Sequence, residues 1–178
     1  AWEEVRIWSR TQESVDRFLA SESDKYPHLK IVGSTDLEQT VRGADVTVTG
    51  THAQGWIVDD AWVDPGTHLA APRADLKGEQ QPQPATLQRA RVFVDDIRQC
   101  REDGEINVPL SEGQITEDDL AGEIGKVICG ELVGRESDEQ ITVFDSTGIA
   151  LQDSATVPLE YERAVEAGVG VEKKMIST

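Results

Sequence analysis

The chain has 178 residues and a formal net charge of −17, with 34 acidic and 17 basic side chains. Nucleic acids and anionic membrane surfaces are bound by clustered cations, so this composition excludes both as partners. The sequence has no stretch that is long and apolar enough to span a bilayer, and it does not open with a signal-peptide pattern. We therefore expect a soluble cytoplasmic protein.

The acidic charge is distributed unevenly along the chain. Residues 1–89 hold 14 acids and 9 bases, a net charge of −5, whereas residues 90–178 hold 20 acids and 8 bases, a net charge of −12. Only 6 of the 17 bases are lysines. An acidic surface with few lysines is typical of salt-adapted proteins, because high ionic strength screens the repulsion between the acids. We hypothesise a halophilic, archaeal source.

The residues that most often bind metals or form disulfides show no useful spacing. Cys100 and Cys129 form no C-x-x-C pair and suggest no disulfide framework. His28, His52 and His68 also lack the spacing of metal ligands. We expect no metal site.

Strands and helices are predicted to alternate in the first half of the chain. Residues 4–9 alternate as in a strand, and Val15, Phe18 and Leu19 then recur at helical spacing. The Thr35–Glu38 segment has the spacing of a capping box at the start of a helix. The predicted elements are strands at 4–9, 29–32 and 44–50 and helices at 11–23 and 35–42.

The segment from Thr40 to Asp75 predicts two buried strands separated by a functional loop. The second strand starts at Thr67, after the turn Asp64-Pro65-Gly66, and ends near Asp75. Open α/β sheets place their chemistry just beyond the carboxyl ends of the strands, which makes Asp75 a candidate catalytic residue. A loop aspartate that caps a turn is the alternative.

The second half of the chain continues the alternation. Thr116 and Asp119 have capping-box spacing, and Leu120, Ile124 and Ile128 lie on one face of the helix predicted to follow. The other predicted elements are a loop at 78–84, helices at 85–90, 96–102 and 148–167, the last kinked at Pro158, and strands at 91–95 and 141–144. This order implies an α/β fold, with a mostly parallel sheet and helices on both faces.

The turn Ser9-Arg10-Thr11 is a candidate cofactor site. In dinucleotide-binding folds the turn after the second strand meets the adenosine ribose, where an acid favours NAD and an arginine with small hydroxyls suits a 2′-phosphate. Arg10 supplies the cation, although a solvated turn arginine would look the same. A G-x-G-x-x-G turn, which such a fold uses to hold the pyrophosphate, is absent from the sequence.

Several segments resemble the ornithine cyclodeaminase family, with its relatives mu-crystallin, ketimine reductase and archaeal alanine dehydrogenase. The blocks that carry the resemblance are Val5–Thr11, Gly43–Val46, Trp62–His68, Val92–Asp95, Gly134–Gly148 and Ala150–Asp153. They extend over nearly the whole chain in the family's order, and they correspond to the later part of a family member. The resemblance implies a Rossmann-like domain that binds NAD(H) or NADP(H).

The resemblance also implies how the chain is divided. Residues 1–146 would form a partial Rossmann domain that lacks its first β-strand and the glycine-rich turn. Residues 147–178 would form a long C-terminal helix and tail that return to a substrate-binding and dimerisation domain. The parent protein would be a homodimer.

Roles for single residues follow from the same resemblance. Asp75 would be the catalytic aspartate, which assists proton movement as hydride leaves the substrate's α-carbon and the resulting imine loses ammonia. The substrate would be a small amino acid or a cyclic imine. Thr49 and Thr51 would border the cofactor, and Ser146 would meet the nicotinamide. The Ser9-Arg10-Thr11 turn is similar to that of NADPH-binding mu-crystallin, so NADP is favoured over NAD.

Two departures from the family pattern leave a second function open. Relatives carry a small glycine where this chain has Arg73, and the preceding Pro72 removes an amide donor. The alternative is a non-catalytic protein that binds a nucleotide or small ligand, as mu-crystallin does. On either interpretation, we expect these 178 residues alone to be incomplete and inactive.

Overall fold

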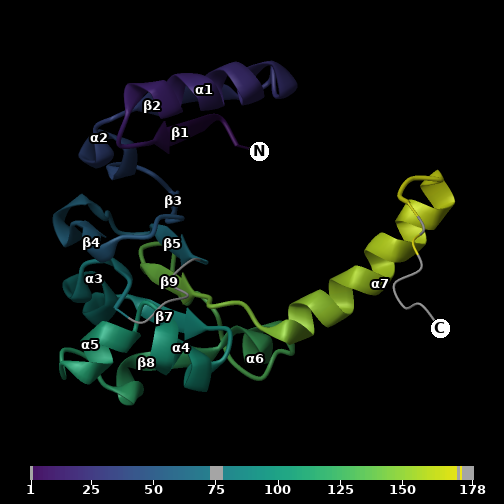
Figure 1. Cartoon of the computed structure of the whole chain (residues 1–178). Coiled ribbons are helices and arrows are strands. Elements are labelled where there is room, and N and C mark those ends of the chain that lie inside the picture. Colours follow the sequence, from purple (N-terminus) through teal and green to yellow (C-terminus); the bar gives the residue numbers. More distant parts are fainter. Residues whose placement is uncertain (1, 73–77, 172, 174–178) are drawn as a thin grey trace. The chain divides into compact units, whose positions relative to one another are not determined.

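The computed structural model of the chain describes residues 2–72, 78–171 and 173 (Figure 1). The chain divides into two compact units, Ala1–Thr147 and Gly148–Thr178. Among the described residues the strands all lie in the first unit, and the second holds the helix α7 (Ala150–Ala167). Pro158 lies inside α7, as the sequence indicates.

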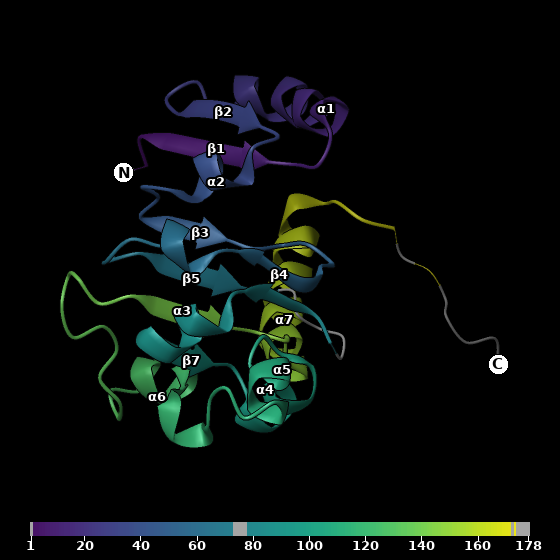
Figure 2. The same cartoon turned by 90° about the vertical axis from the view of Figure 1, so that its left-hand side faces the viewer.

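The main sheet of the first unit has five strands in the order β3-β5-β9-β7-β8. Each neighbouring pair is parallel, and Figure 2 shows β3, β5, β9 and β7 side by side. The strands are β3 (Val46–Val48), β5 (His68–Ala71), β9 (Thr142–Asp145), β7 (Arg91–Val94) and β8 (Leu120–Glu123). The sheet's inner strands are rich in fully buried valine and leucine because a parallel sheet is covered on both faces.

A separate two-stranded parallel sheet precedes the main one. It pairs β1 (Glu4–Trp8) with β2 (Lys30–Ser34), and the helix α1 (Gln12–Glu22) connects them. Val15 of α1 is buried, and a side chain at Gly33 of β2 would collide with it. The glycine therefore lets α1 lie close against this pair of strands.

A third parallel pair, β4 (Gln54–Val58) with β6 (Gln80–Pro82), differs from the sequence prediction. We expected a loop between the strands of the Thr40–Asp75 segment and another loop over 78–84. Both contain strands, and the three residues of β6 are buried although they are Gln, Gln and Pro. Polar strand residues of this kind carry no apolar alternation, so the pattern does not reveal them.

Short helices connect the strands. They are α2 (Leu37–Val41), α3 (Pro84–Arg89), α4 (Ile97–Asp103), α5 (Asn107–Ser111) and α6 (Ile124–Ile128), with 3-10 turns η1 (Ser23–Lys25), η2 (Asp60–Trp62) and η3 (Glu117–Asp119). The continuous helix predicted after Thr116 is wrong at Leu120–Glu123, which form a strand, and its last part forms as the separate helix α6. The capping box forms, but it caps only η3, after which Leu120 enters a strand and Ile128 is exposed.

The cap of α2 also differs by one residue from the prediction. Asp36, and not Thr35, is the N-cap, and its carboxylate accepts a hydrogen bond from the backbone N–H of Gln39 at 3.1 Å. Aspartate and threonine are both common caps, so adjacent candidates are hard to separate by sequence. The expected fold class, an α/β protein with a mostly parallel sheet and a long C-terminal helix, is confirmed. None of the helices in the described ranges has the length and apolar character to cross a membrane.

Candidate functional site

The carboxyl ends of three parallel strands form one polar edge of the main sheet. Thr49 follows β3, Asp95 follows β7, and Ser146 follows β9. Backbone hydrogen bonds continue the ladder to this edge, from Thr49 N to Ala70 O at 2.9 Å and from Ser146 N to Ala71 O at 3.1 Å. Open parallel sheets bind their ligands just outside this edge. We therefore take it as the candidate site.

Ser146 is held by a buried carboxylate. Its hydroxyl donates a hydrogen bond to Asp95 Oδ2 at 2.9 Å, and the two side chains are 7% and 8% exposed. Thr147 Oγ1 lies 3.4 Å from the other oxygen of Asp95. Because the Ser146 hydroxyl donates its single proton to Asp95, the lone pairs of its oxygen remain to accept a hydrogen bond from a ligand.

The two threonines after β3 differ in their surroundings. Thr51 donates two hydrogen bonds to Gln81 Oε1, from its backbone N–H at 3.0 Å and from its hydroxyl at 2.9 Å. Thr49 is 5% exposed, and its hydroxyl has no hydrogen-bond partner among the described residues. A buried hydroxyl without a partner is costly, so Thr49 is the side chain at this edge best suited to receive a polar ligand atom.

A buried carboxyl pair lies behind the edge. Gln81 donates to Glu105 twice, from its backbone N–H to Oε2 at 2.6 Å and from its side chain to Oε1 at 3.2 Å. Asp145 accepts from the backbone N–H of Ile106 at 3.2 Å. At Gly104 an added Cβ would lie 2.5 Å from Asp145 Oδ2, so the residue must be a glycine for the chain to pack here.

Burial sets the protonation of this pair. Desolvation raises the pKa of Glu105 to about 8 and that of Asp145 to about 7, in each case outweighing the hydrogen bonds that favour the charged form. Burial, and then the charge of Asp145, also raises the pKa of the Cys100 thiol. Cys100 is therefore a thiol that donates to Asp95 at 3.1 Å, and it is not a nucleophile.

The Ser9-Arg10-Thr11 turn lies at the carboxyl end of β1. Thr11 caps α1 by accepting a hydrogen bond from the backbone N–H of Ser14 at 3.3 Å. Arg10 is exposed and forms no hydrogen bond or ion pair with the residues that the structure describes. A guanidinium in this state is available to an anionic ligand.

The predicted residues thus fall into three groups. Thr49 and Ser146 directly follow strands of the main sheet and Thr51 lies in the loop after Thr49, whereas the Ser9–Thr11 turn follows a strand of the separate sheet. Asp75 lies outside the described residues. Sequence reasoning assigned no role to Asp95, Gln81 or Glu105, which hold the polar edge in place. Asp95 carried a signal, since it directly follows an apolar strand, but Gln81 and Glu105 lie in segments without periodicity.

A large cavity adjoins the polar edge within the first unit. It has a volume of about 1020 Å³ and is lined by residues of β1 and α1 on one side and by residues 43–51 on the other, including Thr49. A smaller, open recess of about 290 Å³ lies at the amino ends of β7 and β8. Because parallel sheets bind ligands at the opposite edge, we do not consider the smaller recess a candidate site.

The parallel sheet with crossover helices and a polar carboxyl edge defines the Rossmann-like class of α/β domains. Residues 1–168 match the model of the ornithine cyclodeaminase/mu-crystallin family, and the chain belongs to that family. The resemblance inferred from the sequence blocks is therefore confirmed.

Three relatives illustrate the match. The alanine dehydrogenase of Archaeoglobus fulgidus is 38% identical over 167 residues, which cover 94% of this chain and 51% of that protein. The structure of an archaeal alanine dehydrogenase dimer with bound NAD superposes with a TM-score of 0.88 at 37% identity, covering 98% of this chain and 53% of the other. The structure of the Thermococcus litoralis Δ1-pyrroline-2-carboxylate reductase, in complex with NADH and L-proline, superposes with a TM-score of 0.89 at 25% identity. That match covers 96% of this chain and 53% of the other. The chain spans about half the length of these relatives.

Proposed function

We propose that the chain forms the cofactor-binding part of an NAD(P)-dependent oxidoreductase that acts on a small amino acid or imine. The observation that carries the proposal is the polar edge of the sheet, where Thr49 presents a buried hydroxyl without a described partner. The family membership and the cofactors and substrates named for its relatives support this function. Because the chain spans half of those relatives, the activity is proposed for a longer polypeptide or complex.

The described residues at the polar edge of the main sheet fit a nicotinamide cofactor. Ser146 is fixed by Asp95, so its oxygen would accept a hydrogen bond from a carboxamide N–H. Thr49 would bind a second polar atom, and Thr51 is held by Gln81 beside it. The cofactor supplies hydride transfer, and these residues orient it. A glycine-rich turn for the pyrophosphate would have to come from outside residues 1–178.

Asp75 remains our candidate for proton transfer. Oxidation of an amine to an imine requires a proton to leave nitrogen as hydride leaves carbon, and a carboxylate serves as the acceptor. Its place in the chain shortly after β5 and the family resemblance support this role.

We also propose that residues 147–178 return to a second domain that binds substrate and forms a homodimer. Within its own unit, α7 exposes large apolar side chains at helical spacing: Leu151, Val157, Tyr161 and Val165 are each more than half exposed. An apolar stripe of this kind on a helix is normally covered by a partner.

A second candidate is a protein that binds the nucleotide without turnover. Pro72, directly after β5, supports it, because proline offers no amide N–H to a ligand at this edge. The two functions are separated by a turnover assay and not by cofactor binding, which both predict.

The assay uses a chimera in which residues 1–178 replace the matching half of the A. fulgidus alanine dehydrogenase. We expect NAD(P)H-linked turnover with alanine, proline or their imines, and at least a hundred-fold loss in kcat for Asp75→Asn. The control is Asp64→Asn, which changes a turn carboxylate that accepts a bond from Gly43 N. Cofactor binding without turnover on any of these substrates would favour the non-catalytic alternative.

A further inference from the structure

Arg6 of β1 donates hydrogen bonds to the carboxyl end of α2. Its Nη1 donates to the backbone oxygens of Gln39 at 3.2 Å, Thr40 at 3.3 Å and Arg42 at 2.6 Å, and its Nη2 donates to Gly43 O at 3.1 Å. The last carbonyls of a helix have no partner within the helix, and an arginine side chain is one of the groups that can satisfy them. One guanidinium therefore binds four carbonyls where α2 ends.

Trp8 of the same strand binds the other end of α2. Its indole Nε1–H donates to Thr35 O at 3.0 Å, directly before the N-cap residue Asp36. Arg6 and Trp8 are two residues apart, so their side chains leave the same face of β1, about 6.6 Å apart along the strand. The five residues of α2 are about 7.5 Å long, which matches this spacing. β1 thus holds α2 at both ends, and Figure 2 shows the two elements next to each other.

α2 belongs to the core that supports the main sheet. Val41 is 3% exposed and lies in the same hydrophobic cluster as Leu69 of β5 and Val143 of β9. Among the described strands, β1 and β2 form a sheet of their own. The contacts of Arg6 and Trp8 therefore tie that sheet to the main one through α2.

The nitrogens of the Arg6 guanidinium all have partners within the chain. Nη1 and Nη2 bind the carbonyls at the end of α2, and Nε lies 3.1 Å from Glu4 Oε1 in an ion pair. Arg10, four residues later, is exposed and bonds to none of the residues that the structure describes. Arg10 is therefore suited to contact a ligand, whereas Arg6 acts on the backbone that leads to it.

We propose that Arg6 and Trp8 are positioning residues that set the cofactor preference, an inference that rests on the proposed nicotinamide-dependent function. They hold the Ser9-Arg10-Thr11 turn, which directly follows Trp8, in place relative to the polar edge of the main sheet. A dinucleotide has to reach this turn and Ser146 at the same time. A displacement of the turn by about 1 Å weakens a charge-assisted bond to a 2′-phosphate, while the contacts of the nicotinamide at the main sheet stay as they are.

The test is a titration of NADPH and NADH against the chimera with the A. fulgidus alanine dehydrogenase, in the wild-type form and as Arg6→Lys, at one ionic strength. Lysine keeps the charge, but a single ammonium cannot bond to four carbonyls. We expect Arg6→Lys to weaken NADPH at least about fivefold and NADH less than about twofold. Trp8→Phe, which keeps an aromatic ring and removes the indole N–H, should act in the same direction. An equal loss for both cofactors, or an unchanged ratio of their affinities, overturns the proposal.

The matched control is Arg17→Lys on α1, in the same part of the chain. The Arg17 side chain is 71% exposed and forms an ion pair with Glu13 at 3.6 Å. The same substitution there should leave both affinities as in wild type. A change in the ratio as large as that of Arg6→Lys would show that the contacts with α2 are not the cause, and it would refute the proposal.

A second measurement uses the 178-residue chain without nucleotide. Spin labels on the exposed Cys129 and on Arg17→Cys report the distance between α6 and α1, while the buried Cys100 stays unlabelled. We expect a broader distance distribution in Arg6→Lys than in wild type, and no change in Arg98→Lys, at an exposed arginine of α4. An unchanged distribution in Arg6→Lys overturns the proposal. A broadened distribution, together with a wild-type chimera that binds neither cofactor, would support the positioning by Arg6 and refute the proposed function.

Discussion

Glu105 makes the stability of the chain depend on pH. Burial raises its pKa from an ordinary 4.5 to about 8, and that of Asp145 from 3.8 to about 7. The folded chain therefore holds protons that the unfolded chain releases, and the free energy of unfolding falls as pH rises from about 4.5 to about 8. We expect urea midpoints to decrease from pH 5 to pH 8, and Glu105→Gln to make this decrease shallower.

The matched control for Glu105 is Glu102→Gln, an exposed acid three residues earlier. It should leave the slope of the urea midpoint against pH unchanged. Glu105→Gln also disturbs the contact with the Gln81 side chain, so its midpoint starts lower at pH 5. An unchanged slope in Glu105→Gln would show that another group binds the proton.

Substitution of Arg10 tests whether the protein prefers NADP or NAD. If its guanidinium contacts a 2′-phosphate, the charge-assisted bonds contribute about 1.5–3 kcal/mol, and Arg10→Ala should weaken NADPH about ten- to a hundred-fold. NADH has no such phosphate and should bind nearly as before. The measurement is cofactor titration of the chimera at one ionic strength, because salt screens an exposed charge. An equal loss for both cofactors would make Arg10 structural, and a wild-type preference for NADH would refute the NADP assignment.

At the scale of elements, apolar runs were predictable and polar ones were not. The strands at residues 4–9, 91–95 and 141–144 appear within a residue or two of their predicted bounds, as does the helix α1. The strand predicted from Thr67 starts at His68 but ends at Ala71, before the predicted end near Asp75. These segments carry the valines and isoleucines of a buried sheet, whose pattern is readable from sequence. The polar strand β6 escapes prediction because its burial depends on Gln81 meeting Glu105, a contact across 24 residues.

The segment 116–128 shows the opposite error. Leu120, Ile124 and Val127 have helical spacing, yet the chain is extended at 120–123 because β8 pairs with β7 at the edge of the sheet. Gly122, with φ of 133°, adopts a conformation that other residues avoid, and this suits a strand irregularity better than a helix. Tertiary pairing therefore outweighed a local periodicity.

At the scale of the whole molecule, the family resemblance located residues at the strand ends but not the side chains that hold them in place. Thr49 and Ser146 could be named from the sequence through the family resemblance, which implies their places beside the cofactor. The side chains that hold Thr51 and Ser146 are Gln81 and Asp95, and they are set by which strands become neighbours, β4 with β6 and β7 with β9. Strand order depends on long-range packing, and a single sequence contains no direct record of it.

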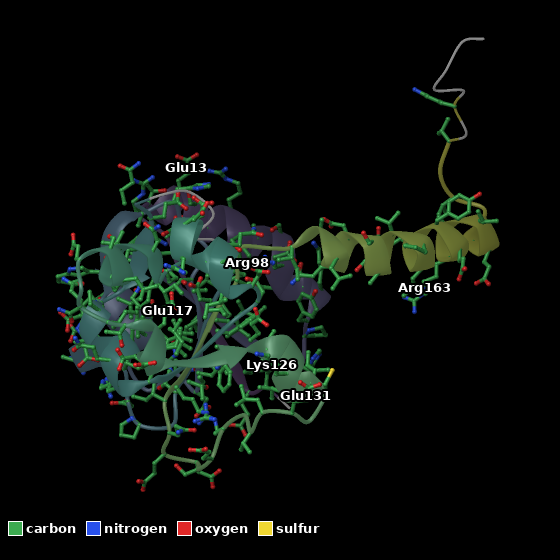
Figure 3. All side chains as sticks on the ribbon, turned by 90° about the horizontal axis from the view of Figure 1, so that it is seen from below. Glu13, Arg98, Glu117, Lys126, Glu131 and Arg163 are labelled. Atoms are coloured by element: carbon green, nitrogen blue, oxygen red, sulfur yellow. The ribbon has the colours of Figure 1, made fainter. Side chains whose placement is uncertain are left out.

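The net charge of −17 gives the last prediction. Acidic side chains such as Glu13, Glu117 and Glu131 stand at the surface (Figure 3), where their repulsion is screened by salt. We expect the thermal midpoint of the chain to rise from low salt to multimolar KCl, as for a salt-adapted protein. The triple variant Glu102→Gln, Glu112→Gln, Glu131→Gln removes three exposed acids of the more acidic half. It should be more stable than wild type at low salt and should converge with it at high salt. A wild-type midpoint that is the same at both salt concentrations would rule out salt adaptation.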